Sequence, residues 1–176
     1  MVSEQDKTLE AINMAIQMEI DGKEHYLKAS QESGNELGKK LLQSLAAEED
    51  FHRKKFEEIY NTIQISKTWP EADYQPDGGK RLRTILAKAT GRIASKIKAE
   101  GTELDAVKIA MDMETKTYDF YKSQSEKVTY DAERDFYEKV SAEEREHHLI
   151  LLDYYEYLKD PAGWFVNKEH PSLDGG

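Results

Sequence analysis

The sequence contains no cysteine among its 176 residues. Within these residues, that absence excludes disulfide bonds, thiolate-bound metals, iron–sulfur clusters and cysteine nucleophiles. A cysteine-free chain is typical of proteins that work in a reducing compartment, so we expect this one to be cytoplasmic.

Long apolar runs and excess positive charge are also missing. No stretch of about 18 apolar residues occurs, and the first seven residues lack the basic and apolar regions of a signal peptide. The net charge is -10, and 34% of the residues are charged. We therefore expect no membrane and no nucleic acid as partner, and an acidic surface that attracts cations.

Helical periodicity runs through almost the whole chain, whereas strand-like alternation is absent. The pattern predicts an all-α protein with long helices over residues 3–33, 36–65, 102–127 and 131–159. Capping signatures begin the first and third of these helices, at Ser3 with Asp6 and at Thr102 with Asp105. The first helix is predicted to bury one apolar face, formed by Ile12, Ile16, Ile20 and Leu27.

The connections between these helices differ in length. Gly34-Asn35 makes a tight first turn, residues 66–101 form a long crossover, and Pro161 with Gly163 ends the last helix. These lengths predict a four-helix bundle over residues 1–160, followed by a C-terminal tail over residues 161–176. We expect Trp164 and Phe165 in that tail to pack back onto the bundle.

The crossover contains a basic amphipathic segment, Lys80–Lys98, with seven lysines or arginines and no acid. Such a segment can bind a membrane surface or an acidic partner. We favour a helix that packs on the acidic bundle or on a second subunit.

The pattern E-x-x-H occurs twice, from Glu49 to His52 and from Glu144 to His147. Residues three positions apart lie on one face of a helix, so both side chains can reach the same metal. The two copies are 95 positions apart, and the same spacing separates further pairs, Glu19 from Glu114 and Tyr26 from Tyr121. The chain is therefore an internal repeat of two helical hairpins.

Hairpin geometry predicts that the four repeated glutamates meet. Residues equidistant from a hairpin turn lie at the same height, and the midpoint of Glu19 and Glu49 is Gly34. The midpoint of Glu114 and Glu144 falls beside the second turn. All four glutamates then lie about 22 Å from the turns, at ~1.5 Å per residue.

Four carboxylates that converge in a core repel one another unless cations balance them, and two divalent metals would do so. Oxygen-rich ligands with one imidazole per metal suit iron or manganese. We assign to one metal Glu19, Glu49 and His52, and to the other Glu114, Glu144 and His147. By symmetry the bridging pair is Glu49 and Glu144.

Other polar residues near the motifs carry weaker predictions. Tyr26 and Tyr121 follow Glu19 and Glu114 by seven residues, so they could hydrogen-bond ligands, relay an electron or simply pack in the core. Glu48 is rotated by about 100° from Glu49, and we expect it to point off the inner face, as we expect His25 and His148 to do.

The combined pattern resembles the di-iron ferritin-like superfamily and most closely the rubrerythrin group. It consists of a glutamate with a tyrosine seven residues later on one helix and E-x-x-H on the next, repeated once. The resemblance implies a ferritin-like bundle with two irons, or manganese or mixed metals, and a homodimer. It also implies an oxidoreductase that reduces hydrogen peroxide or dioxygen at these six ligand residues.

The chain also departs from the group. Rubrerythrins usually carry a rubredoxin domain with paired C-x-x-C motifs, so the resemblance here implies an external electron donor such as a rubredoxin-like protein. Thr117 stands where many rubrerythrins have an extra glutamate, and Lys23 stands where a small apolar residue would pack.

Two alternative functions stay open. Bacterioferritins share the paired motif, so a ferroxidase or iron-binding protein of that type is one alternative. The first motif has no methionine between Glu49 and His52 or just after it, and we expect no haem. The other alternative is a non-catalytic metal-binding bundle.

Overall fold

The computed structural model describes residues 1–71, 73–90 and 101–164, without the side chains of residues 89 and 90. This part of the chain is helical and contains no strand, which confirms the all-α prediction. The helices are α1 (Glu4–Glu32), α2 (Glu36–Ser66), α3 (Lys80–Thr90), α4 (Gly101–Lys127) and α5 (Asp131–Lys159). None of the described helices is both long enough and apolar enough to span a membrane.

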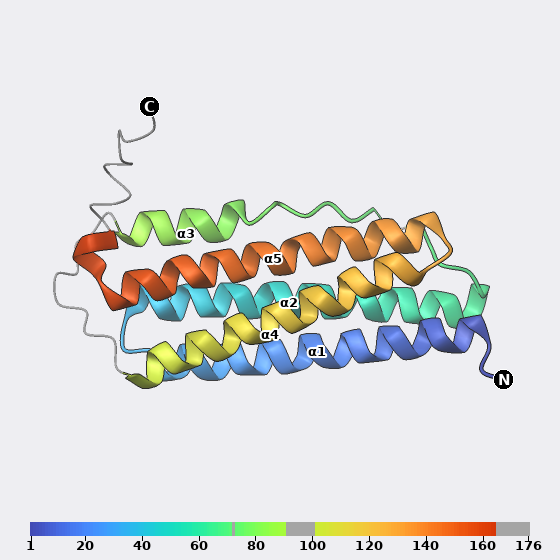
Figure 1. Cartoon of the computed structure of the whole chain (residues 1–176), viewed down its shortest axis with the longest axis horizontal. Helices are drawn as coiled ribbons and strands as arrows, with labels where there is room; N and C mark the ends of the chain where they lie inside the picture. Colours follow the sequence, from blue (N-terminus) through green and yellow to red (C-terminus); the bar gives the residue numbers. More distant parts are fainter. Residues whose placement is uncertain (72, 91–100, 165–176) are drawn as a thin grey trace, which may run out of the picture.

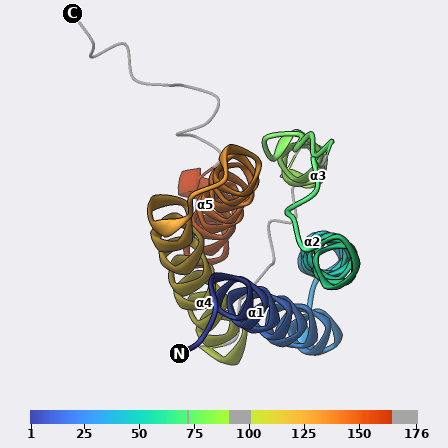
Figure 2. The same cartoon turned by 90° about the vertical axis from the view of Figure 1, so that its right-hand side faces the viewer.

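The four long helices run side by side as two antiparallel hairpins, α1–α2 and α4–α5, whose turns lie at opposite ends of the bundle (Figure 1). Viewed along the bundle, α1 lies between α2 and α4, and α5 follows α4 (Figure 2). The crossover returns along the bundle, and its helix α3 packs against both α2 and α5. The predicted ferritin-like arrangement, two hairpins joined by a crossover with a short helix, is confirmed.

Side-chain caps fix the starts of two helices. Ser3 Oγ accepts a hydrogen bond from the Asp6 backbone N–H at 3.1 Å, and the Asp6 carboxylate accepts one from the Ser3 N–H, as predicted. Asn35 caps α2, because its side-chain oxygen accepts from the Gly38 N–H at 2.6 Å. Tyr130 precedes α5 and provides no side-chain cap.

Some predicted bounds differ from the structure. Gly101 already lies in α4, so Thr102 falls inside the first turn and is not the N-cap. Only Lys80–Thr90 of the basic segment is seen as helix, and residues 91–98 lie outside the described part. The last helix ends at Lys159 as expected, but residues 161–164 are helical again, since proline is well suited to the first turn of a helix.

Only part of the tail prediction can be compared with the structure. Trp164 packs on Tyr157 with ring centroids 5.5 Å apart. Phe165 lies outside the described residues.

The core consists of two apolar clusters with a polar layer between them. The first cluster, near the turn between α1 and α2, includes Leu41, Leu45, Val107, Leu151 and Tyr154. The second, near the turn between α4 and α5, includes Ile12, Phe56, Ile63, Phe136 and Val140. The prediction for Leu27 is wrong, since it is 38% exposed. In this part of α1 the inward positions belong to Glu19 and Tyr26. Leu27 directly follows Tyr26, so its side chain is turned about 100° away from the inner face.

Candidate metal centre

The six predicted ligand residues lie together in the polar layer. Glu19 comes from α1, Glu49 and His52 from α2, Glu114 from α4, and Glu144 and His147 from α5. Each of them is at most 3% exposed. Helices contributed by both hairpins therefore place four carboxylates and two imidazoles in one enclosed space.

Potential ligand atoms form two overlapping groups, within each of which they lie no more than 4.8 Å apart. The first group is Glu19, Glu49, His52 and Glu144, and the second is Glu49, Glu114, Glu144 and His147. Glu49 and Glu144 belong to both groups. These are the two residues that the sequence predicts as the bridging pair.

The histidine rings face the cluster through their Nδ1 atoms. His52 Nδ1 lies 3.0 Å from a Glu144 oxygen and 3.4 Å from a Glu19 oxygen. His147 Nδ1 lies 3.1 Å from a Glu49 oxygen and 3.5 Å from a Glu114 oxygen. The two rings stack with centroids 5.7 Å apart. Each imidazole therefore points at carboxylates from other helices, as two neighbouring metal sites would require.

Unsatisfied polar atoms show that the donor set suits metal ions. Among the described residues, nine buried side-chain nitrogen or oxygen atoms have no hydrogen-bond partner. Seven of these nine atoms belong to the six predicted ligands, and they include both Nδ1 atoms. Leaving a buried polar atom unpaired costs ~1–3 kcal/mol. Two divalent cations would satisfy these atoms and balance the four carboxylates.

The electrostatics also favour cation binding. Burial raises the pKa of Glu49 and Glu144 well above the usual range, and the neighbouring glutamates raise it further. Burial alone would lower the pKa of His147, but the carboxylates of Glu114 and Glu48 raise it well above its usual value. The metal-free cluster therefore holds protons where cations would bind, so metal binding would displace protons.

Two buried tyrosines form hydrogen bonds between the two hairpins in the polar layer. The Tyr26 hydroxyl donates to Glu114 Oε1, and the Tyr121 hydroxyl donates to Glu19 Oε1. Each tyrosine therefore holds the glutamate of the opposite hairpin. Burial raises the pKa of both phenols well above the usual range, so they remain hydrogen-bond donors. Of the roles considered for these tyrosines, the geometry shows the hydrogen bond.

Two further glutamates contact the histidines from outside the cluster. His52 Nε2 lies 2.7 Å from Glu143 Oε2, and His147 Nε2 lies 2.7 Å from Glu48 Oε2. The prediction that Glu48 points off the inner face is wrong, because its carboxylate contacts the buried ring of His147 on α5. A signal was present, since a glutamate directly precedes each motif to give E-E-x-x-H twice.

The remaining polar residues near the motifs have partners of their own. Lys23 Nζ binds Asp50 Oδ1 at 2.9 Å and so directs its charge away from the cluster. Thr117 is buried, and its hydroxyl donates to the Met113 carbonyl at 2.9 Å. His25 and His148 are half-buried, and each approaches a backbone carbonyl of α4.

A small cavity adjoins the cluster. It measures about 10 Å³, and its lining includes Gly22, Glu49, Glu114 and Thr117. A Cβ at Gly22 would lie 2.8 Å from Glu49 Oε2, so glycine leaves room for that carboxylate. A cavity of this size holds about one water-sized molecule.

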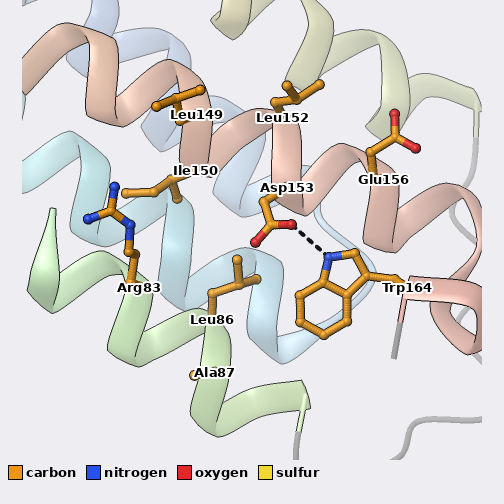
Figure 3. A pocket seen from close by; sticks show the side chains of 9 residues that line it. All are labelled: Arg83, Leu86, Ala87, Leu149, Ile150, Leu152, Asp153, Glu156 and Trp164. Carbon is orange, nitrogen blue, oxygen red and sulfur yellow. Dashed lines mark hydrogen bonds between the residues drawn. The ribbon is translucent and has the colours of Figure 1, made fainter. Parts of the chain in front are cut away.

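A much larger pocket of about 510 Å³ lies elsewhere, between α3, α5 and the indole of Trp164 (Figure 3). The indole N–H of Trp164 donates to Asp153 Oδ1 at 2.8 Å. No residue of the cluster lines this pocket.

A four-helix bundle with four glutamates and two histidines at its centre defines the class of ferritin-like carboxylate-bridged metal proteins. The rubrerythrin family model matches residues 10–155, and the chain belongs to that family. A search of curated proteins and a search of solved structures found no match. Membership implies an iron-binding protein, and members of the family are usually oxidoreductases.

Proposed function

We propose that this protein is a non-haem di-iron oxidoreductase that reduces hydrogen peroxide, or dioxygen, with electrons from a separate donor. The observation that carries the proposal is the enclosed cluster in which seven carboxylate and imidazole atoms have no hydrogen-bond partner. Family membership supports iron as the metal and redox chemistry as the reaction class. Manganese has similar ligand preferences and is the alternative metal.

The ligand roles follow from the two overlapping groups. Glu19 and His52 would hold one iron, Glu114 and His147 would hold the other, and Glu49 with Glu144 would bridge them. Four carboxylates neutralise two divalent cations, which removes the cost of burying the charges. Tyr26 and Tyr121 would keep the outer glutamates in orientation through their hydrogen bonds.

The reaction itself requires two electrons and two protons for each peroxide molecule that becomes two waters. When bound, the iron pair would supply the two electrons. The chain excludes bulk water from the cluster by burial and leaves a water-sized cavity beside Glu49 and Glu114. That size favours peroxide or dioxygen over an organic substrate.

The electron donor is proposed to be a different protein or domain. These 176 residues contain no cysteine, so a thiolate-bound iron centre that feeds the cluster would have to lie outside them.

The test is anaerobic loading with ferrous iron, followed by rapid mixing with peroxide and, separately, with oxygen. We expect two irons per chain and much faster oxidation by peroxide. Glu49→Ala serves as the site-deficient control and should lose the fast phase. Faster oxidation by oxygen, with uptake of more than two irons per chain, would identify an iron-storage ferroxidase instead. Failure to bind two metals would leave a non-catalytic bundle.

A further inference from the structure

The outer hydrogen bonds of the two histidines follow the internal repeat. His52 pairs with Glu143, and His147 pairs with Glu48, each at 2.7 Å through Nε2. Because Nδ1 faces the cluster in both rings, these glutamates accept the remaining ring N–H. Such partners fix the tautomer and orientation of a metal-binding imidazole.

A single crossover joins the two hairpins, and its residues make different contacts with the two histidine–glutamate pairs. Tyr74 donates its hydroxyl to Glu143 Oε2 at 2.6 Å, and its side chain is only 2% exposed. Its ring packs between Phe51 and Phe136, with centroid separations of 6.1 and 5.2 Å. The buried phenol of Tyr74 therefore adds a second hydrogen bond to the carboxylate that pairs with His52.

The pair formed by His147 and Glu48 has a weaker contact with the crossover. The crossover residue Arg81 forms an ion pair with Glu48, and its Nη2 lies 3.9 Å from Glu48 Oε1. This distance is too long for a hydrogen bond, and the Arg81 side chain is 58% exposed. An exposed ion pair of this kind contributes roughly 0–1 kcal/mol and restrains its partner weakly.

The contact with Tyr74 limits how Glu143 can move. One oxygen, Glu143 Oε2, accepts from both His52 and Tyr74, so rotation of the carboxylate would break two hydrogen bonds in a buried space. Among the described residues, the Glu48 carboxylate accepts one side-chain hydrogen bond, from His147, so its rotation would break that bond alone. The ring of His52 is consequently held more firmly than that of His147.

We propose that Tyr74 is a positioning residue that makes the two metal positions unequal, so that the position beside His52 binds its metal more tightly and releases it more slowly. The inference rests on the proposed two-metal site. The outcomes differ: a protein that fails to bind two metals refutes the proposed function, whereas one that binds two equally refutes only this inference.

The first test is a titration of the metal-free 176-residue chain with Co(II), followed by calorimetry and visible absorption. We expect two binding steps whose affinities differ by about 10-fold, the lower range for loss of an outer partner. Tyr74→Phe keeps the aromatic packing and should weaken the tighter step by about 10-fold while changing the other less than about 2-fold. Arg81→Gln is the matched control and should change neither step by more than about 2-fold.

A double-mutant cycle shows whether Tyr74 acts through Glu143. In a Glu143→Ala background, Tyr74→Phe should have no further effect on Co(II) affinity. In a Glu48→Ala background, it should keep its full effect. A purely structural role for Tyr74 would weaken binding in both backgrounds, and that result would overturn the proposal.

A measurement on the wild-type protein tests the proposal without depending on whether the variants fold. In the Co(II)-loaded protein, the ring N–H protons of the two ligand histidines should give separate, strongly shifted NMR signals. After transfer to D₂O, the signal of His52 should persist longer than that of His147, because the hydroxyl of Tyr74 covers its acceptor. Equal exchange rates, or a reversed order, would overturn the inference.

Discussion

The two hairpins of the bundle are alike where they meet and different at their edges. At the centre, each residue of the cluster has a counterpart 95 positions away, and the hydrogen bonds of Tyr26 and Tyr121 are reciprocal. At the edges, α2 has a side-chain cap from Asn35, but α5 has none from Tyr130. Burial of four carboxylates is costly unless all partners are in place, so the centre is constrained while the edges can diverge.

The largest effect should come from removing a shared glutamate. Glu49→Ala or Glu144→Ala should abolish binding of both metals, because each carboxylate belongs to both ligand groups. Glu19→Ala or Glu114→Ala should weaken one position and leave the other able to bind. Metal content after dialysis measures this, with the exposed Glu126→Ala as control. Full metal content in Glu49→Ala would contradict the assignment.

The second-largest effect should be on stability, and it should come from the difference in capping between α2 and α5. Asn35 caps α2 and also donates to Glu103 at 2.9 Å and to the Tyr154 hydroxyl at 3.2 Å. Asn35→Ala should therefore lower the free energy of unfolding of the metal-free protein by about 2 kcal/mol in a urea titration. Tyr130→Ala, the matching change in the other hairpin, should cost under about 0.5 kcal/mol. Equal losses would remove the distinction between the two helix starts.

A pH-dependent difference should follow from Glu133, whose counterpart in the first hairpin is Gly38. Burial, followed by repulsion from Glu4, raises the pKa of Glu133 to about 7. The folded state thus keeps a proton that the unfolded state loses above about pH 4.5. The associated stabilisation is present below that pH and is lost as the pH rises through about 7.

Glu133→Gln tests this titration through thermal unfolding at two pH values. It should stabilise the protein at pH 8 relative to wild type by about 1 kcal/mol, allowing for solvent screening, and have little effect at pH 4. The exposed Glu138→Gln on the same helix is the control. A gain that does not depend on pH would show that Glu133 does not titrate in this way.

The smallest effect should be a gain at the uncapped helix. Tyr130 is 57% exposed, so little packing is lost when it is replaced. Tyr130→Asn would reproduce in α5 the cap that Asn35 provides in α2 and should add about 0.5–1 kcal/mol to the free energy of unfolding. Urea unfolding with Tyr130→Ala as reference separates the cap from the loss of the ring. No difference between these two variants would show that α5 gains nothing from a cap.

The helices and the cluster could be predicted because both depend on local spacing and on the repeat. The capping box at Ser3 involves residues three positions apart, and each E-x-x-H motif presents its two ligands on one helical face. The spacing of 95 residues then related the two hairpins and brought Glu114 into the set. None of these inferences required knowledge of how the helices pack.

Contacts between separate helices or loops could not be predicted in this way. The reach of Glu48 to His147, and of Tyr74 to Glu143, depends on the rotation and separation of packed helices and on the course of the crossover. The exposure of Leu27 has the same origin, since the position of Glu19 and Tyr26 determines which face is inward. Helical periodicity locates the apolar stripe of a helix only to within one residue position along the sequence.

The central claim is that two metal ions share Glu49 and Glu144 at the middle of the bundle. The most direct test is an electron paramagnetic resonance titration of the metal-free protein with Mn(II). We predict that two ions bind per chain and that the signal of isolated Mn(II) is lost as the second ion binds, because bridged ions couple magnetically. A full-intensity signal of isolated Mn(II) at saturation, or saturation at one ion per chain, would contradict the account.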